Sequence, residues 1–455
     1  MLAARMQALR AMRNSIACLG LLLGLAGCHP FGAGGAGDDA CKNRVRDGDE
    51  SDVDCGGGAC AACLPEQACR VDGECQSRLC VAGGCEAASG PPFWLPVARL
   101  PTAREDLSAA GVDTDGRISV VGGKNAAGPL ATVEAYDPPT DTWSAAPSLG
   151  TARSGLGASL GSDGVLYAIG GETANGPSAA VEKLAAGAAS WSAGPSLATP
   201  RSGLAVGHSE GFILAVGGDA VGTVESFDLA AWSARPSLPT PRSALGIGPP
   251  FGNDQPLYAV GGRVAGGAVS TVESFHVKAG QWITSAPISS GRFGLAVSPG
   301  GDNRLWAIGG TDGATDSAVV EAFSQKAGRW SKLPPLALAR HGLSACLGSD
   351  GRLYALGGAT ASGPVDLVEA YGPRITVTPS TAAAGDVITV SGDNFAANAP
   401  VFIALSTSTQ AHTDAAGVLH PVQLVLPRTA SPGKLGVDVI DLASGFEAKS
   451  TLTIH

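Results

Sequence analysis

Short apolar runs alternate with turn residues along most of the chain at a nearly constant spacing. Many of these runs end in a Gly-Gly pair, as in VLYAIGG at residues 165–171. The pairs begin at Gly122, Gly170, Gly217, Gly261, Gly309 and Gly357, at intervals of 48, 47, 44, 48 and 48 residues. Short apolar runs bounded by turns are typical of strands. The pattern predicts an all-β fold built from one repeated unit.

Each unit follows the same plan. An Arg precedes a strand of small residues, an apolar strand ends in Gly-Gly, and Val-Glu, an aromatic residue and a Trp follow. Repeats of about 40 to 50 residues with short strands predict a β-propeller, with four strands in each blade. Because a feature present six times is not one active site, we expect structural Arg to Glu contacts around the ring. These residues are Arg104, Arg153, Arg201, Arg242, Arg292 and Arg340, with Glu134, Glu182, Glu225, Glu273, Glu321 and Glu369.

The tryptophans predict how the ring closes. Trp143, Trp191, Trp232, Trp282 and Trp330 follow their glycine pairs by 21, 21, 15, 21 and 21 residues, but Thr378 stands where a sixth belongs. Trp94 lies 28 residues before the first pair, as the other tryptophans lie 26 to 29 residues before their next pair. The N-terminal strand should therefore complete the last blade and leave only short sheet edges.

This repeat resembles the kelch family over residues 93–372. The resemblance implies a six-bladed kelch-type β-propeller. In this reading Gly-Gly permits close approach of neighbouring backbones, the Val and aromatic positions fill the core between blades, and Trp packs on the outer strand.

A ligand site is expected where the repeats differ. One and two places after each Arg the residues are mostly Ser and Gly, but Glu105, Asp106, Phe293 and His341 depart from that pattern. If these positions face the central channel or one rim, they could bind a polar ligand. Ordinary variation between repeats is the competing explanation.

Catalysis is not expected. Galactose-oxidase-like proteins also join a kelch propeller to an immunoglobulin-like tail, but they hold copper through tyrosines and histidines, and the seven histidines here form no Tyr-His pair. Cys346 occupies a position that is small in every other repeat, which favours an inert buried thiol. The remaining enzymatic analogy is to sugar epimerases or mutarotases with six kelch blades, for which Glu105, Asp106 and His341 are the candidates.

The pattern changes from Pro373 onward. Alternating apolar residues between turn signals predict a small β-sandwich over residues 373–455. The segment from Gly385 to Phe395, with the later turn at Pro432 and Gly433, resembles bacterial immunoglobulin-like domains. Such domains usually act as spacers or caps, or take part in adhesion.

The N-terminus predicts export. Arg5, Arg10 and Arg13 precede an apolar stretch from Ile16 to Gly27 that is too short to cross a bilayer. The sequence LAGC at 25–28 resembles a lipoprotein signal, so residues 1–27 should be removed and Cys28 lipidated. An ordinary signal peptide is the alternative, and translation could also start at Met6 or Met12. In lipoproteins an aspartate after the lipidated cysteine tends to hold the protein at the inner membrane, so the resemblance implies that His29 favours the outer membrane, on the periplasmic or cell-surface side. Residues 28–40 are predicted to form a flexible tether.

Residues 41–86 form a cysteine-rich module with few large apolar side chains. An exported chain meets an oxidising compartment, so an even set of close cysteines argues for disulfides over zinc. Four acidic residues before Cys55 could bind calcium, and the alternative is a solvated acidic loop without a bound ion. The cysteines are Cys41, Cys55, Cys60, Cys63, Cys69, Cys75, Cys80 and Cys85, and the acids are Asp47, Asp49, Asp52 and Asp54.

Composition narrows the choice of partner. The chain has 65 glycines among 455 residues, only 5% aromatics and a formal net charge of −10. Nucleic acid is bound by clustered Lys and Arg, and no basic run follows the leader, so nucleic acid is not expected. We expect no cofactor beyond calcium. The sequence predicts an envelope lipoprotein that presents its propeller to a protein or polysaccharide, with a carbohydrate-active enzyme and calcium-dependent adhesion as alternatives.

Overall fold

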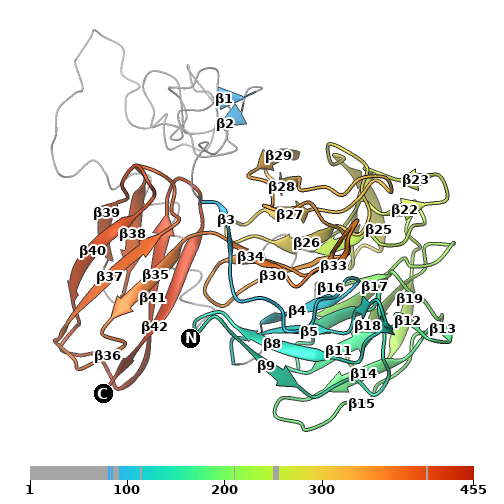
Figure 1. Cartoon of the computed structure of the whole chain (residues 1–455), viewed down its shortest axis with the longest axis horizontal. Helices are drawn as coiled ribbons and strands as arrows, with labels where there is room; N and C mark the ends of the chain where they lie inside the picture. The colour runs from blue at the N-terminus through green and yellow to red at the C-terminus, as the bar shows by residue number, and fades with distance from the viewer. Residues whose placement is uncertain are drawn as a thin grey trace. The chain divides into compact units, whose positions relative to one another are not determined.

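The computed structural model describes residues 80–81, 84–85, 92–112, 115–209, 211–248, 256–405 and 408–455. The regular elements in these ranges are all strands, as the sequence predicted. The chain divides into two compact units, Met1–Ala87 and Ala88–His455. In the first unit, the backbone of β1 (Cys80–Val81) pairs antiparallel with that of β2 (Gly84–Cys85). The second unit holds a propeller followed by a two-sheet sandwich (Figure 1).

The propeller consists of six four-stranded antiparallel sheets, which we number as blades 1 to 6. Blade 1 contains β4 (Ser108–Val112), β5 (Ile118–Val121), β8 (Val133–Asp137) and β9 (Thr142–Ala146). Blade 2 contains β10 (Gly157–Leu160), β11 (Leu166–Ile169), β14 (Val181–Leu184) and β15 (Ser192–Ala193). Blade 3 contains β16 (Ala205–Ser209), β17 (Phe212–Val216), β18 (Val224–Phe227) and β19 (Trp232–Arg235).

The second half of the ring repeats this order. Blade 4 contains β20 (Gly246–Gly248), β21 (Leu257–Val260), β24 (Val272–His276) and β25 (Gln281–Ser285). Blade 5 contains β26 (Ala296–Pro299), β27 (Leu305–Ile308), β28 (Val320–Ser324) and β29 (Arg329–Leu333). Blade 6 contains β30 (Ser344–Leu347), β31 (Leu353–Leu356), β34 (Val368–Tyr371) and the early strand β3 (Trp94–Pro96). Each innermost strand contacts the innermost strands of both neighbouring blades, and β30 against β4 completes the circle.

The second strand of each blade explains the continuous apolar runs. In β5, β11, β21, β27 and β31 all four residues are buried. A strand with both faces covered needs apolar residues at every position, whereas a half-exposed strand alternates. These strands are covered because each blade packs between two others.

The N-terminal strand closes the ring as predicted. β3 pairs antiparallel with β34, so that Trp94 lies opposite Tyr371. The indole Nε1 of Trp94 donates a hydrogen bond to the carbonyl of Pro334, in the chain that follows blade 5, at 3.0 Å. Each of the five other repeat tryptophans donates in the same way to a carbonyl that follows the outer strand of the preceding blade. Trp94 therefore supplies the sixth such bond.

The glycine pairs allow neighbouring blades to touch through their backbones. Gly123 N donates to the carbonyl of Arg153 in the next blade at 2.9 Å, and the equivalent bond occurs at all six junctions. A Cβ on Gly122 would lie 2.5 Å from that same carbonyl oxygen, and both glycines have positive φ. No other residue type combines that backbone conformation with so little space. The predicted reason for the Gly-Gly signature is confirmed.

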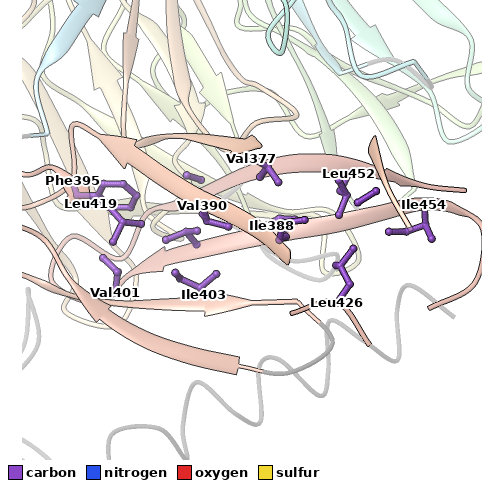
Figure 2. Packing of buried hydrophobic residues seen from close by; sticks show 14 residues of the cluster. Val377, Ile388, Val390, Phe395, Val401, Ile403, Leu419, Leu426, Leu452 and Ile454 are labelled. Atoms are coloured by element: carbon purple, nitrogen blue, oxygen red, sulfur yellow. The ribbon is translucent and has the colours of Figure 1, made fainter. Parts of the chain in front are cut away.

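Residues after the propeller form a sandwich of two sheets. The three-stranded sheet contains β35 (Arg374–Thr378), β37 (Val387–Asp393) and β40 (Leu419–Val425). The five-stranded sheet contains β36 (Thr381–Ala382), β38 (Pro400–Ala404), β39 (Ser408–His412), β41 (Gly433–Asp441) and β42 (Glu447–Ile454). Figure 2 shows their shared core, in which Ile388 and Val390 of one sheet face Ile403 and Leu452 of the other. The immunoglobulin-like assignment stays a prediction.

Candidate ligand site at the hub of the propeller

Six buried arginines fix the chain where each innermost strand begins. In every blade the guanidinium contacts the glutamate of the third strand, at 2.5 to 2.9 Å in the first five blades, and Arg340 pairs with Glu369 in the sixth. The guanidinium groups also donate to backbone carbonyls; Arg153 Nη1, for example, reaches Ala180 O at 2.8 Å. Desolvation lowers the pKa of Arg153, but the paired carboxylate opposes that effect. These pairs are structural, as the sixfold repetition predicted.

The two residues after each arginine meet at the centre of the propeller, and we call them the hub. The hub comprises Glu105, Asp106, Ser154, Gly155, Ser202, Gly203, Ser243, Ala244, Phe293, Gly294, His341 and Gly342. The second residue of each pair donates its N–H to the carbonyl of its counterpart in the preceding blade, at 2.7 or 2.8 Å. Six such bonds run unbroken around the ring, from Asp106 through blades 2 to 6 and back to Asp106. The positions that the sequence singled out are therefore neighbours in space.

Two hub positions carry a side chain where the backbone favours glycine. The ring residues have φ between 49° and 62°, which four of the six satisfy with glycine. Asp106 and Ala244 adopt φ of 51° and 49°. A left-handed conformation costs an ordinary residue about 1 to 2 kcal/mol, although Asp tolerates it better than most. Asp106 therefore holds its carboxylate at the centre against a local backbone preference.

Three of the four predicted site residues belong to one network of charges. His341 Nδ1 lies 2.6 Å from Asp316 Oδ1, and His341 Nε2 lies 3.5 Å from Glu105 Oε2. Lys124 Nζ lies 2.8 Å from Asp106 Oδ2 and 3.9 Å from Glu105 Oε1. The network joins blade 1, blade 6 and blade 5 across the end of the innermost strands. All five side chains remain partly exposed, so a ligand could reach them.

The network changes the protonation of its members. The hydrogen bond with Glu105 raises the pKa of His341 against the effect of burial, and Asp316 adds to the increase. The same hydrogen bond lowers the pKa of Glu105. Burial lowers the pKa of Lys124, but its contacts with Asp106 and Glu105 outweigh burial, so the net pKa is raised. The hub thus favours ionised carboxylates around a protonated imidazole and a protonated amine.

Phe293 lies in a separate contact group of the hub. Its backbone bridges to Thr311, and its ring lies 5.1 Å from the guanidinium carbon of Arg263 in blade 4. A cation over an aromatic face is a stabilising arrangement worth about 0.5 to 1 kcal/mol at exposed sites. The hub therefore offers a charged side at Glu105 and His341 and an aromatic side at Phe293.

Sequence reasoning missed three members of the site. Lys124, Asp316 and Arg263 lie in the segments after the glycine pairs, which read as small and flexible loops. Lys124 and Arg263 bridge back to the hub residues Glu105 and Ser243. A charged residue within two places of a glycine pair is the signal that could have found Lys124 and Arg263.

The segments after the glycine pairs are unequal around the ring. Four blades carry a short hairpin there: β6 (Lys124–Asn125) with β7 (Gly128–Pro129), β12 (Glu172–Thr173) with β13 (Gly176–Pro177), β22 (Arg263–Val264) with β23 (Gly267–Ala268), and β32 (Ala359–Thr360) with β33 (Gly363–Pro364). Blade 5 makes a single bridge between Thr311 and Asp316. In blade 3 the Asp219 carboxylate accepts hydrogen bonds from Val221 and Thr223 in a tight turn, four residues shorter than its counterparts. Less chain therefore surrounds the hub on the blade 3 side.

Other candidates lie apart from the hub or outside the described residues. Cys346 is buried, and burial raises the pKa of its thiol to about 12, which agrees with an inert core position. Among the described residues, no three His, Cys, Asp or Glu side chains are grouped to hold a metal ion. Cys28, the four acids at 47–54 and the cysteines from 41 to 75 lie outside the description, and Cys80 and Cys85 are described in backbone only.

Within the described ranges, no helix has the length and apolar character needed to span a bilayer.

Comparisons with known proteins agree with the propeller. The Kelch motif family model matches residues 110–150 and 293–337. The solved structure titled "Structure of YjhT" has a TM-score of 0.50 at 16% sequence identity, and the match covers 62% of this chain and 97% of that one. A structure titled "Novel fungal alcohol oxidase with catalytic diversity among the AA5 family, in complex with copper" has a TM-score of 0.48 at 15% identity, covering 77% and 85% of the two chains. No curated protein sequence matches the chain.

The motif matches fall within blades 1 and 5, where the observed strands and glycine pairs follow the predicted unit. The structural match, which covers 97% of the other chain, is a likeness of fold. The chain therefore contains a six-bladed kelch-repeat β-propeller.

Proposed function

We propose that the chain is an envelope lipoprotein whose propeller binds a protein or polysaccharide at the hub. The observation that carries the proposal is the placement of the repeat-breaking residues. Glu105, Asp106 and His341 share one network, and Phe293 lies beside it on the same ring. The two positions after each arginine meet at the centre in every blade, so the specific feature is that the side chains here pair with Lys124 and Asp316 and stay partly exposed. Binding residues are commonly loop residues held on a rigid scaffold.

The hub suits a ligand with several polar groups and at least one apolar face. Carboxylates and an imidazole accept and donate hydrogen bonds, and the Phe293 ring offers a flat surface for a sugar ring or an apolar side chain. The shorter turn of blade 3 leaves one side of the hub less enclosed, which favours an extended ligand over a small enclosed one. A polysaccharide or a protein segment meets both conditions.

The location is part of the proposal and rests on the N-terminal sequence. Lipidation at Cys28 would anchor the chain in the outer membrane, and the tether over 28–40 and the cysteine-rich module over 41–86 would hold the propeller away from the lipid surface. Globomycin treatment, which blocks lipoprotein signal cleavage, should leave the full-length precursor. Replacement of Cys28 by Ala should release the chain from the membrane fraction.

The binding proposal is tested by restoring the repeat consensus. The variant Glu105→Ser, Asp106→Gly, Phe293→Ser, His341→Ser carries at each position a residue that other blades already carry, so it should fold. The full chain in detergent would be heated with envelope polysaccharides and with peptides from envelope proteins. A ligand at about 100 times its dissociation constant adds about 2.7 kcal/mol and raises the melting temperature.

The control changes exposed outer-strand positions instead. Gln281→Ser and Lys332→Ser alter β25 and β29 but leave the hub intact. The wild type and this control should be stabilised by the same ligand, and the consensus variant should not be. A ligand that stabilises all three proteins equally would place binding elsewhere and contradict the proposal.

A carbohydrate-active enzyme is the second candidate, and one observation favours it. His341 lies between two carboxylates, and a histidine next to Glu105 could exchange protons with a bound sugar hydroxyl. Turnover on a panel of reducing sugars, measured as interconversion of anomers or epimers by NMR, would support this role if His341→Gln abolished it. Binding without interconversion would leave the hub as a recognition site.

A further inference from the structure

His341 lies where blade 6 meets blade 1 at the hub. Blade 1 begins the ring and blade 6 ends it, and we call the contact between their hub residues the closing seam. Two bonds cross the seam at the hub: Asp106 N donates to Gly342 O at 2.8 Å, and His341 Nε2 lies 3.5 Å from Glu105 Oε2. On its other side, His341 Nδ1 contacts Asp316 of blade 5. One imidazole therefore links three blades.

The geometry favours a doubly protonated ring. Ionised carboxylates only accept hydrogen bonds, and a neutral imidazole has one N–H donor and one bare nitrogen. Whichever nitrogen lacks the proton would direct its lone pair toward a carboxylate oxygen. Both contacts are favourable only when Nδ1 and Nε2 each carry a hydrogen, that is, when His341 is a cation.

The charged groups around His341 support the same state. Blade 1 contributes Glu105 and Asp106 with Lys124, and blade 5 contributes Asp316. Within blade 6 the backbone of His341 bridges to Ala359, which carries no charge. The ammonium of Lys124 lies 2.8 Å from the Asp106 carboxylate and neutralises its charge. The carboxylates of Glu105 and Asp316 are therefore the two acceptors for the imidazole. Their contacts raise the pKa of His341 and lower that of Glu105.

We propose that the proton on His341 is a pH-controlled tie across the closing seam that strengthens the contact of blades 5, 6 and 1 in acid and weakens it in base. The hub would then be most rigid at mildly acidic pH. Loss of the proton would replace two ion pairs by repulsion between a lone pair and a carboxylate. This role of His341 does not depend on which ligand the hub binds.

The sign of the pH effect follows from the direction of the shift. A folded-state pKa above the ordinary imidazole value gives a stabilisation that is fully present below about pH 6.5, the unfolded value. It is lost as the pH rises through the folded-state value. Relative to a variant without this imidazole, the wild type should therefore gain more stability at pH 5.5 than at pH 9.

The matched variant is His341→Ser, because Ser occupies the same hub position in blades 2, 3 and 4. Urea unfolding of the full chain in detergent, at pH 5.5 and pH 9, gives the midpoint of each protein. The difference between the urea midpoints of the wild type and His341→Ser should be larger at pH 5.5 than at pH 9. His412→Gln, which changes an exposed histidine on β39, should keep the wild-type pH dependence.

A second measurement isolates the imidazole itself. Deuterium exchange at the imidazole Cε1, read by mass spectrometry, gives the titration midpoint of individual histidines. The His341 midpoint should fall in Glu105→Gln and in Asp316→Asn. Backbone protection in peptides spanning 341–347, corrected for the base-catalysed rise of intrinsic exchange, should decrease as the pH rises in the wild type and not in His341→Ser. The tie is overturned if the His341 midpoint is the same in both variants and the wild type, or if the pH dependence of unfolding survives in His341→Ser.

Discussion

Replacing Trp94 tests the closure of the ring most directly. This side chain is 6% exposed, and its ring centroid lies 5.3 Å from that of Tyr371 and 6.4 Å from that of Trp306. A buried aromatic replaced by Ala costs about 3 to 5 kcal/mol. The carbonyl of Pro334 also loses its indole donor, which adds about 1 kcal/mol. Trp94→Ala should therefore lower the free energy of unfolding by about 4 to 6 kcal/mol.

The matched control is Trp232→Ala in blade 3. Trp232 makes the same kind of indole to carbonyl bond, to Pro195 at 2.8 Å, and stacks on Phe227 at 5.0 Å. It is more exposed than Trp94 and lies in a blade that is formed from one continuous stretch of chain. Its loss should cost only about 1 to 3 kcal/mol. Urea unfolding followed by far-ultraviolet circular dichroism would compare the two. An equal or smaller cost for Trp94→Ala would refute the view that β3 closes the propeller through this side chain.

Three further changes probe the interior. Glu273→Gln leaves the buried guanidinium of Arg242 without the carboxylate that lies 2.5 Å from it, and should lower the free energy of unfolding, measured in urea, by about 3 to 5 kcal/mol. A loss below about 1 kcal/mol would contradict a buried ion pair. Ala244→Gly relieves a left-handed backbone at φ 49° and should leave stability unchanged or raise it by up to about 1 kcal/mol, so a clear loss would show that the methyl group packs usefully. Cys346 should resist a thiol-specific chromogenic reagent at pH 8 until urea unfolds the chain, because burial raises its pKa; rapid reaction in the folded protein would disprove its burial.

The repeat made most of the propeller predictable from the sequence. The Gly-Gly and Trp positions report contacts that recur at every junction between blades, and the Arg and Glu positions report a contact that recurs within every blade, so the number of blades and the closing strand follow from spacing alone. Trp94 is the clearest case, because its distance from Gly122 placed it in the missing outer strand before any pairing was known.

The site was predictable only in part, for a physical reason. Glu105, Asp106 and His341 were visible because they replace Ser or Gly at positions that a repeat aligns. Asp316 has no such alignment: it lies seven residues after Gly309, in a segment whose path depends on the turn it makes. The contact between His341 and Asp316 joins neighbouring blades through loops, and sequence spacing carries no information on that distance. The same holds for Arg263 over Phe293.

The ring of hydrogen bonds at the hub is made of main-chain atoms alone. Each blade is fixed to its neighbours through N–H and C=O groups that every residue except proline possesses, so the first hub position of each blade can change its side chain without removing any of those bonds. Glu, Ser, Phe and His already occupy that position in one molecule. The main-chain ring is therefore independent of the side chains at six adjacent positions, which form a compact surface on which new specificity can be selected or engineered while those bonds are kept.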